Sequence, residues 1–347
     1  MRTGEFRTTY AADMAIFETP VARWSLGVFL VLLFLSPLMA TNYWMDVLNR
    51  ICIAVIGAVG LNILTGFTGQ VSMGNAAFLA VGAYTTSFMA NRWDLPWMVT
   101  LPTAGLVTAL VGMVFGTPSL RLKGLYLAMS TLAAHFIVEF ATVHWESVTG
   151  GVNGTSVPAA RIFGFALDSD TRLFYLIAST AVALVFFAKN LFRTKVGKAF
   201  IAIRDQDISA EVMGVNVYKH KLLSFGVSSF YVGVAGSLLA YQARIISPEN
   251  FPLSVAIDYL GMIIIGGLGS ILGSILGAIF ITLLPELLRL VTGAVSGVLP
   301  GLVQLFASLR MGVFGLAIVL FLIFEPDGLA ARWHTIKNYW KLYPFSY

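Results

Sequence analysis

The chain has 347 residues, of which 58% are hydrophobic and only 11% are charged, and its formal net charge is +5 at pH 7. Soluble domains carry about 25% charged residues, so the composition excludes a soluble domain and indicates a polytopic membrane protein. The small excess of basic residues lies beside apolar runs, as in membrane proteins generally, and does not indicate a nucleic-acid partner.

Ten apolar runs are long enough, or nearly so, to form transmembrane helices, which need about 20 residues. The run 255–268 is short for a full span. The predicted fold class is all-α, a polytopic integral membrane protein with roughly ten transmembrane helices, one broken-helix segment and one short helix in a polar loop. The predicted spans are Trp24–Ala40, Val47–Thr65, Gly74–Ala90, Trp97–Gly116, Gly124–Val143, Leu173–Ala188, Leu222–Tyr241, Val255–Leu268, Ile271–Leu290 and Val303–Phe324.

The distribution of lysine and arginine predicts the orientation, because positive residues gather on the cytoplasmic side. With the N-terminus inside, 15 of the 22 basic residues fall in inner segments and four in outer loops. We therefore expect a cytoplasmic N-terminal segment (1–23), a transmembrane domain (24–324) and a cytoplasmic C-terminal tail (325–347). The inner loop 189–221 alone carries seven basic residues. Residues 1–23 are too mixed in charge for a signal peptide.

The polar loop 189–221 contains a short predicted helix. Asp207 is a typical N-cap residue, Glu211 suits the positive end of the helix dipole, and Gly214 is well placed to end the helix in a left-handed conformation. Fewer than two turns lie between them, so the helix is not stable alone. We expect Ile208 and Val212 to hold it by packing on one face.

Such a helix, carried on the inner ends of membrane helices, is suited to dock on another protein. The alternative is a surface helix bound to anionic lipid through the lysines, which Asp205, Asp207 and Glu211 oppose. The phosphate-binding pattern G-x-x-x-x-G-K-[ST] is absent, since Lys198 is followed by Ala199. If ATP drives this protein, another chain binds it.

A glycine-rich stretch, Gly66–Asn75, separates two apolar runs. Irregular backbone at membrane depth survives only when it is buried in protein or faces a water-filled cavity. This stretch is either a broken helix that lines a substrate path or a plain cytoplasmic turn.

Two further motifs are rich in small or polar residues. The polar stretch Thr149–Thr155 is either a contact with a partner or the gate on the outer side, or a structural turn. Small residues that recur every four positions predict close helix packing, within the chain or against a sister subunit; these are Gly269, Gly273 and Gly277.

Ionisable residues inside spans suggest function, because they are costly in lipid. His135 and Glu139 share one helix face, but their order is not the H-E-x-x-H pattern of zinc proteases. Glu139 is the strongest candidate for a polar group near the path. The residues tentatively assigned to a substrate path are Gly66, Gly69, Gln70, Ser72, Asn75 and Glu139.

Five segments together resemble one known family. They occur in the order GLNILTGFTGQVSMGNAAF (60–78), GLYLAMSTLA (124–133), WESVTGGVNG (145–154), VGKAFIAIRDQDISAEVMGV (196–215) and IIGGLGSILGSILGA (264–278). The combination resembles the permease subunits of branched-chain amino acid ABC importers, of the "M" type, over about residues 45–330.

The resemblance implies an importer in the bacterial inner membrane, surrounded by lipid and built from two related permeases, two cytoplasmic ATPases and a periplasmic solute-binding protein. ATP and Mg²⁺ would bind the ATPases, and this chain would carry no cofactor, metal or catalytic residue. The loop would dock on an ATPase as a coupling helix. The coupling residues implied are Arg204, Asp205, Asp207, Ala210, Glu211 and Gly214.

The resemblance leaves the solute open among branched-chain amino acids, related small polar or carboxylate solutes, urea, short amides and aromatic carboxylates. The chain would move it by alternating access. A different class, a stand-alone secondary transporter or channel, would instead need ion-coupling carboxylates at mid-membrane, and it leaves the loop unexplained. A membrane enzyme is disfavoured because the sequence has no metal-ligand or nucleophile cluster.

Overall fold

The structure is a computed structural model that describes residues 20–342 except 39, 163–164, 167–168, 297–311, 313–314, 317–318, 322 and 326. The described part is almost entirely helical, so the predicted all-α class is confirmed. The predicted segment 1–23 lies outside the described residues up to position 19. Most of the predicted span 303–324 and the last residues of the predicted tail also lie outside them.

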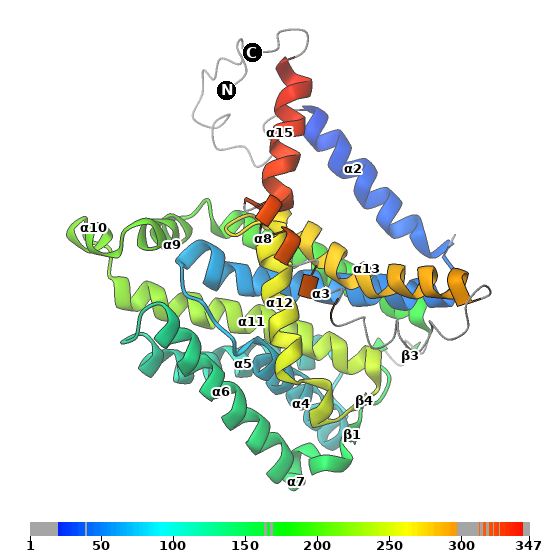
Figure 1. The fold of residues 1–347 in the computed structure, drawn as a ribbon. Coiled ribbons are helices and arrows are strands. Elements are labelled where there is room, and N and C mark those ends of the chain that lie inside the picture. Colours follow the sequence, from blue (N-terminus) through cyan, green and yellow to red (C-terminus); the bar gives the residue numbers. More distant parts are fainter. Residues whose placement is uncertain are drawn as a thin grey trace.

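The helices run in chain order from α2 to α15 (Figure 1). Their bounds are α2 (Pro20–Leu35), η1 (Ser36–Leu38), α3 (Asn42–Thr68), α4 (Asn75–Trp93), α5 (Trp97–Ser119), α6 (Leu125–His144), α7 (Glu146–Thr149), η2 (Gly151–Asn153), α8 (Asp170–Leu191), α9 (Lys195–Asp205), α10 (Asp207–Val212), α11 (Val217–Ala243), η3 (Pro248–Asn250), α12 (Leu253–Gly266), α13 (Ile271–Ser296) and α15 (Gly328–Leu342).

Six of the described helices are long and apolar enough to cross a membrane, namely α3, α5, α6, α8, α11 and the Ile271–Leu290 part of α13. They correspond to six of the ten predicted spans. The count of ten is not confirmed. Among the other predicted spans, α2 has 16 residues and α12 only 14, while α4 has 19 residues but includes several polar ones.

The centre of the molecule is α3, whose residues are buried along most of the helix. Helix α11 packs against α3, α4 and α5, and α13 and α8 also contact α3. Small residues allow these close crossings. Gly60 of α3 lies against Tyr231 of α11, and Gly82 of α4 lies against the backbone of Gly233. The long helices are thereby fixed around one buried axis.

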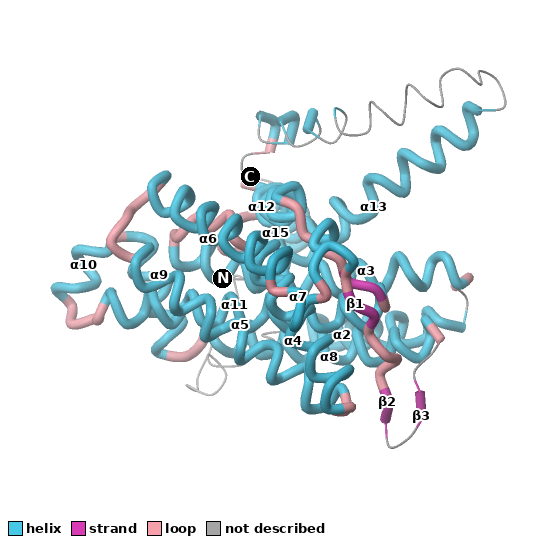
Figure 2. Tube along the Cα trace, turned by 90° about the horizontal axis from the view of Figure 1, so that it is seen from below, coloured by secondary structure: helices cyan, strands magenta, loops and turns pink. Residues whose placement is uncertain are grey.

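The two ends of the bundle differ. Helices α9 and α10 lie at one end, and the short strands lie at the opposite end, in both views (Figures 1 and 2). At the strand end, β1 (Thr155–Ser156) pairs antiparallel with β4 (Ile245–Ile246), and β2 (Arg161–Ile162) pairs with β3 (Phe165–Ala166). The β1–β4 pair ties the loop after α6 to the connection between α11 and α12.

Candidate functional site

Helix α9 anchors the polar loop to the bundle. The side chain of Thr194 caps its first turn by accepting a hydrogen bond from the Gly197 N–H at 3.3 Å. A Cβ at Gly197 would collide with the backbone at Leu191, so the helix starts directly against the end of α8. One face of α9 is buried through Phe200 and Ile203, and the basic residues occupy the remainder.

Helix α10 follows immediately as a separate, shorter helix. Gly214 has a φ of +87°, the left-handed conformation that the sequence predicted. The Val215 N–H donates to the Ala210 carbonyl at 3.0 Å and the Gly214 N–H to Glu211 at 2.9 Å, the bond pair of a Schellman motif. The end of α10 is therefore fixed by backbone geometry that a side chain at Gly214 would strain.

The prediction that Asp207 caps α10 is wrong. The N-cap position belongs to Gln206, and Asp207 is the first residue of the helix. Its carboxylate instead contacts the ammonium groups of Lys123, at 2.6 Å, and Lys221, at 3.5 Å. Charge-assisted pairs are stronger than neutral hydrogen bonds, so two lysines, one from the α5–α6 connection and one from α11, outcompete the local amides.

These ion pairs join the loop to two other connections. The hydrogen bond from Lys123 lowers the pKa of the Asp207 carboxyl, with a smaller contribution from Lys221. Lys123 lies between α5 and α6, and Lys221 lies in the second turn of α11. The start of α10 is thus held to the α5–α6 connection and to the start of α11.

The prediction that Ile208 and Val212 pack on the protein is also wrong. They are 64% and 81% exposed, and Met213 is 84% exposed. Ala210 is the buried residue of α10, and its small side chain lets the helix lie close to α9 and α11. The helix face that the sequence predicted to pack on the protein is instead an exposed apolar surface.

Arg204, at the end of α9, points into the molecule. Its Nη1 donates to the Gly66 carbonyl in the last turn of α3 at 3.0 Å, and its Nε donates to Asp205 at 3.2 Å. Its aliphatic stem lies against Gly69, and a Cβ at Gly269 would collide with its guanidinium. Arg204 therefore contacts both glycine-rich turns that the sequence singled out.

Asn62, which sequence reasoning missed, fixes the second of these turns. Its Oδ1 accepts from the Gly269 N–H at 2.9 Å, and its Nδ2 donates to the Ser270 carbonyl at 2.9 Å and to Ser274 Oγ at 2.7 Å. Asn62 is buried in α3. A lone asparagine within an apolar run is the signal that could have found it. We call Asn62, Arg204, Asp207 and their partners the α9–α10 junction.

The three glycines predicted to share one helix face do not all do so. Gly269 precedes α13 and lies in the turn with a φ of +75°, because the chain must reverse there between α12 and α13. Gly273 and Gly277 lie in α13 against α12, where a Cβ at Gly273 would be 2.6 Å from the Gly266 carbonyl. Their close approach is made within the chain.

The stretch Gly66–Asn75 divides between helix and turn. Helix α3 continues to Thr68, and α4 begins at Asn75, so Gly66 is helical and the break is shorter than predicted. Gln70, Ser72 and Asn75 are buried. Gln70 Nε2 donates to Ser224 Oγ of α11 at 2.8 Å, and Met73 N–H donates to Thr131 Oγ1 of α6 at 2.9 Å. The polar side chains of the turn are thus packed against α11 and α6, whereas Gly69 and Val71 are exposed.

A cavity of about 240 Å³ opens between this turn and the loop. Polar groups dominate its lining, including Gln70, Lys123, Arg204 and Asp207. Its walls are formed by the ends of α3 and α9, by residues 120–124 between α5 and α6, and by the starts of α6, α10 and α11. Among the described residues, no group of three His, Cys, Asp or Glu side chains could hold a metal ion.

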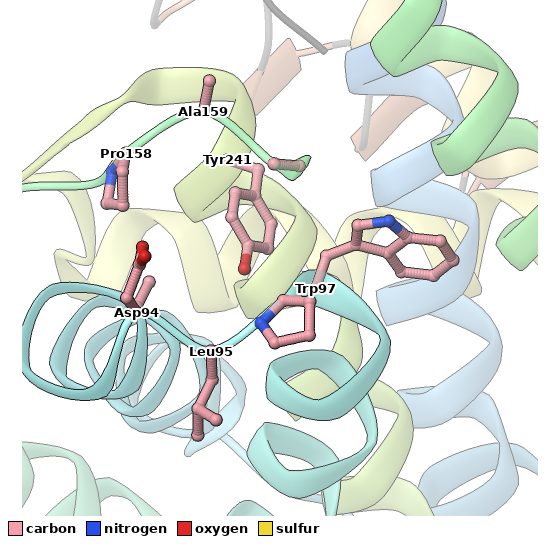
Figure 3. Close-up of a pocket in the computed structure, with 9 residues that line it drawn as sticks. Asp94, Leu95, Trp97, Pro158, Ala159 and Tyr241 are labelled. Atoms are coloured by element: carbon pink, nitrogen blue, oxygen red, sulfur yellow. The ribbon is translucent and has the colours of Figure 1, made fainter. Parts of the chain in front are cut away.

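A second, smaller cavity lies at the strand end, between the start of α5 and residues 158–160 (Figure 3). Its volume is about 60 Å³, which holds no more than a few water molecules. The Tyr241 hydroxyl beside it hydrogen-bonds Thr100 at 2.7 Å. Nearby, Asn91 Nδ2 donates to the Ser156 carbonyl at 2.6 Å. This end of the bundle is closed by direct contacts.

The pair predicted on α6 is split between interior and surface. His135 is 1% exposed, whereas the Glu139 side chain is 46% exposed, and Nε2 of the histidine lies 3.8 Å from the carboxylate. Neither residue belongs to the α9–α10 junction. The structure brings the start of α4 beside this helix through the Met73–Thr131 bond, which joins two parts of the tentative path.

Comparison with known proteins gives the class. The family described as "branched-chain amino acid transport system / permease component" matches residues 43–325, more than half of the chain. The chain belongs to this family of membrane permease components.

The individual relatives are consistent with that class. The chain is 32% identical over 265 residues to the high-affinity branched-chain amino acid transport system permease protein LivM of Escherichia coli, covering 70% of this chain and 62% of the relative. LivM of Salmonella typhimurium is 32% identical over 67% of this chain and 61% of its own length. The galactose/methyl galactoside import permease protein MglC of Escherichia coli is 27% identical over 75% of this chain and 80% of its own. The chain thus spans about three fifths of the LivM relatives. No solved structure matches it.

Proposed function

We propose that this chain is a permease subunit of an ATP-binding-cassette importer that carries branched-chain amino acids or related small solutes into the cytoplasm. The observation that carries the proposal is the apolar surface of α10, in a helix that lies outside the six candidate spans. Exposed Ile208, Val212 and Met213 form a small hydrophobic projection on a segment whose other contacts run inward. An exposed apolar surface of this kind is typical of a site at which another protein docks.

The inward contacts support a mechanical role for the same segment. A partner ATPase that pulls on α10 would act through Asp207 on α5, α6 and α11, and through Arg204 on both glycine turns. Alternating access needs such a connection between a soluble motor and the ends of membrane helices. The chain binds no ATP in this scheme, since ATP and Mg²⁺ reside on the ATPases, and it performs no covalent chemistry.

The rest of the assembly follows from the family. The proposal includes a paired homologous permease, two cytoplasmic ATPases and a periplasmic solute-binding protein, in the bacterial inner membrane with both termini cytoplasmic. The α9–α10 end would then be cytoplasmic, and the β1–β4 end would face the binding protein. LivM relatives are named for branched-chain amino acid transport, which places these amino acids before urea, short amides or aromatic carboxylates.

Reconstitution tests the proposal. The chain is placed in proteoliposomes with its paired permease, ATPases and binding protein, and uptake of L-leucine is measured with and without ATP. We expect uptake that depends on ATP and on the ATPases. Uptake by the purified chain alone, without nucleotide, would identify a secondary transporter or channel instead.

The variant Gly214→Val tests the docking segment. A β-branched residue at a φ of +87° costs about 1–2 kcal/mol. A helix of six residues is only marginally stable, so we expect this cost to disrupt the end of α10. We expect uptake and stimulated ATPase activity to be lost while the binding protein still binds its ligand. Gly27→Val is the control, because nothing lies within 4 Å of that position in α2. Normal uptake by Gly214→Val would remove this account of α10.

A further inference from the structure

A line of polar side chains follows the contact between α4 and α6. Thr131 and His135 are one helical turn apart, Glu139 is a turn further, and residues at this spacing share a face. The start of α4 lies against Thr131, because the Met73 N–H bonds its hydroxyl and a Cβ at Gly74 would lie 3.2 Å from its carbonyl. We call Asn75, Thr131, His135 and Glu139 the α4–α6 seam.

Several buried atoms of this seam have no hydrogen-bond partner. They are Nδ2 of Asn75 and both ring nitrogens of His135. The Glu139 carboxylate, 3.8 Å from the His135 ring, lies beyond hydrogen-bond distance. A buried polar group without a partner destabilises the fold, and lipid cannot supply the missing partner. Partners for these atoms must come from water or from a solute that enters the seam.

Glu139 adds a negative charge to the same line. The exposed part of α6 around it carries apolar side chains such as Phe136 and Phe140, so the carboxylate stands out on this helix. Its single ion pair among the described residues is the one with His135. A carboxylate within a span marks a water-filled path or a polar partner rather than lipid.

We propose that the α4–α6 seam is a solute-contact site of the transport path, and that Glu139 receives the ammonium group of a zwitterionic solute. The inference rests on the proposed function and assigns the contact to named residues. Glu139 supplies an acceptor for an ammonium group, and Asn75, at the start of α4, adds an unpaired N–H donor to the seam. The carboxylate therefore fits a solute with an ammonium group better than urea or a carboxylate without an amine.

Water access to the seam is tested by cysteine labelling. Cys52 is the single cysteine of the chain and is buried. Labelling of this chain therefore reports the introduced cysteine. Glu139→Cys and Ile137→Cys are compared in the assembled importer in membranes, with a charged, water-soluble methanethiosulfonate. Both positions are exposed, but two residues apart on a helix they face in different directions.

We expect Glu139→Cys to react at least tenfold faster than Ile137→Cys, and L-leucine to slow that reaction. Equal, slow reaction at both positions would show that Glu139 faces lipid and would overturn the proposal. This readout does not depend on transport. The labelling contrast could therefore stand even if ATP-driven uptake of leucine failed, which would refute the proposed function alone.

The charge of Glu139 is tested by Glu139→Gln in the reconstituted importer. We expect ATP-driven uptake of L-leucine to fall at least tenfold, with assembly and basal ATPase activity unchanged. Glu325→Gln, which alters a carboxylate that pairs with Arg332 and lies outside the seam, is the control and should transport normally. Leucine uptake by Glu139→Gln at the control rate would overturn the role of the carboxylate.

Discussion

Two polar regions lie beside the α3–α4 connection, and they differ in how their buried polar groups are satisfied. At the α9–α10 junction, the amide of Asn62 makes three hydrogen bonds and Arg204 and Asp207 are paired. In the α4–α6 seam, the nitrogens of Asn75 and His135 have no partner. A fully paired network holds helices in one arrangement, whereas unpaired groups are available to water or a solute. The contrast separates a mechanical region from a binding region.

Substituting one asparagine in each region tests this contrast most strongly. Asn62→Leu removes three bonds and leaves the Gly269 N–H without its partner, at a cost of about 3 kcal/mol. Asn75→Leu removes an amide nitrogen that has no bond to lose. We expect a large fall in Tm in detergent for the first variant and a small one for the second.

Transport should show the opposite pattern among molecules that remain folded. Uptake normalised to folded protein should be reduced more by Asn75→Leu than by Asn62→Leu. The contrast between the regions would fail if Asn75→Leu lowered the Tm as far as Asn62→Leu does.

The next effect in size concerns the link through Arg204. Arg204→Ala removes the bond to the Gly66 carbonyl, and because the side chain is 40% exposed the loss is about 1–2 kcal/mol. We expect ATP hydrolysis to persist while solute uptake falls, since the loop would no longer move the two glycine turns. Uptake per ATP hydrolysed is the measurement.

Arg193→Ala is the matched control for that prediction. The Arg193 guanidinium bonds Asn190 only one turn back in the chain, so its loss should leave the ratio of uptake to hydrolysis unchanged. An unchanged ratio in Arg204→Ala as well would mean that the arginine only stabilises the fold.

The smallest expected effect is the pH dependence of the Asp207 ion pairs. The hydrogen bond from Lys123 lowers the pKa of Asp207 in the folded state. A lowered pKa contributes stability above the unfolded pKa of about 4, and this contribution is lost as the pH falls through the folded value. A partly exposed pair contributes at most about 1 kcal/mol.

Thermal unfolding of wild type and Asp207→Asn across pH measures this contribution. We expect wild type to have the higher Tm at pH 7, and the difference to shrink as the pH is lowered below about 4. A difference that stays constant with pH would show that the carboxylate charge is not involved.

Local patterns predicted some parts of the site correctly. Gly214 ends α10 in a left-handed conformation because few other residues tolerate it, which is a property of the residue itself. Asp207 was misassigned because its partners lie in other elements, Lys123 in the α5–α6 connection and Lys221 in α11. Ile208 and Val212 were misassigned because an apolar residue on a short helix can face either the bundle or a partner. The roles of Asn62 and Thr131 depend on contacts with residues far away in the sequence, which no local pattern contains.

The sequence by itself determined that the chain is an α-helical membrane protein, where most of its long apolar helices lie, and that a short helix interrupts them in a basic loop. Hydrophobicity and helix-ending residues act over a few turns, so they can be read along the chain. Only the tertiary structure decided which polar groups are paired, that Arg204 points inward to both glycine turns, and that the start of α4 lies beside Thr131. These are contacts between residues far apart in sequence, and their geometry exists only once the helices have packed.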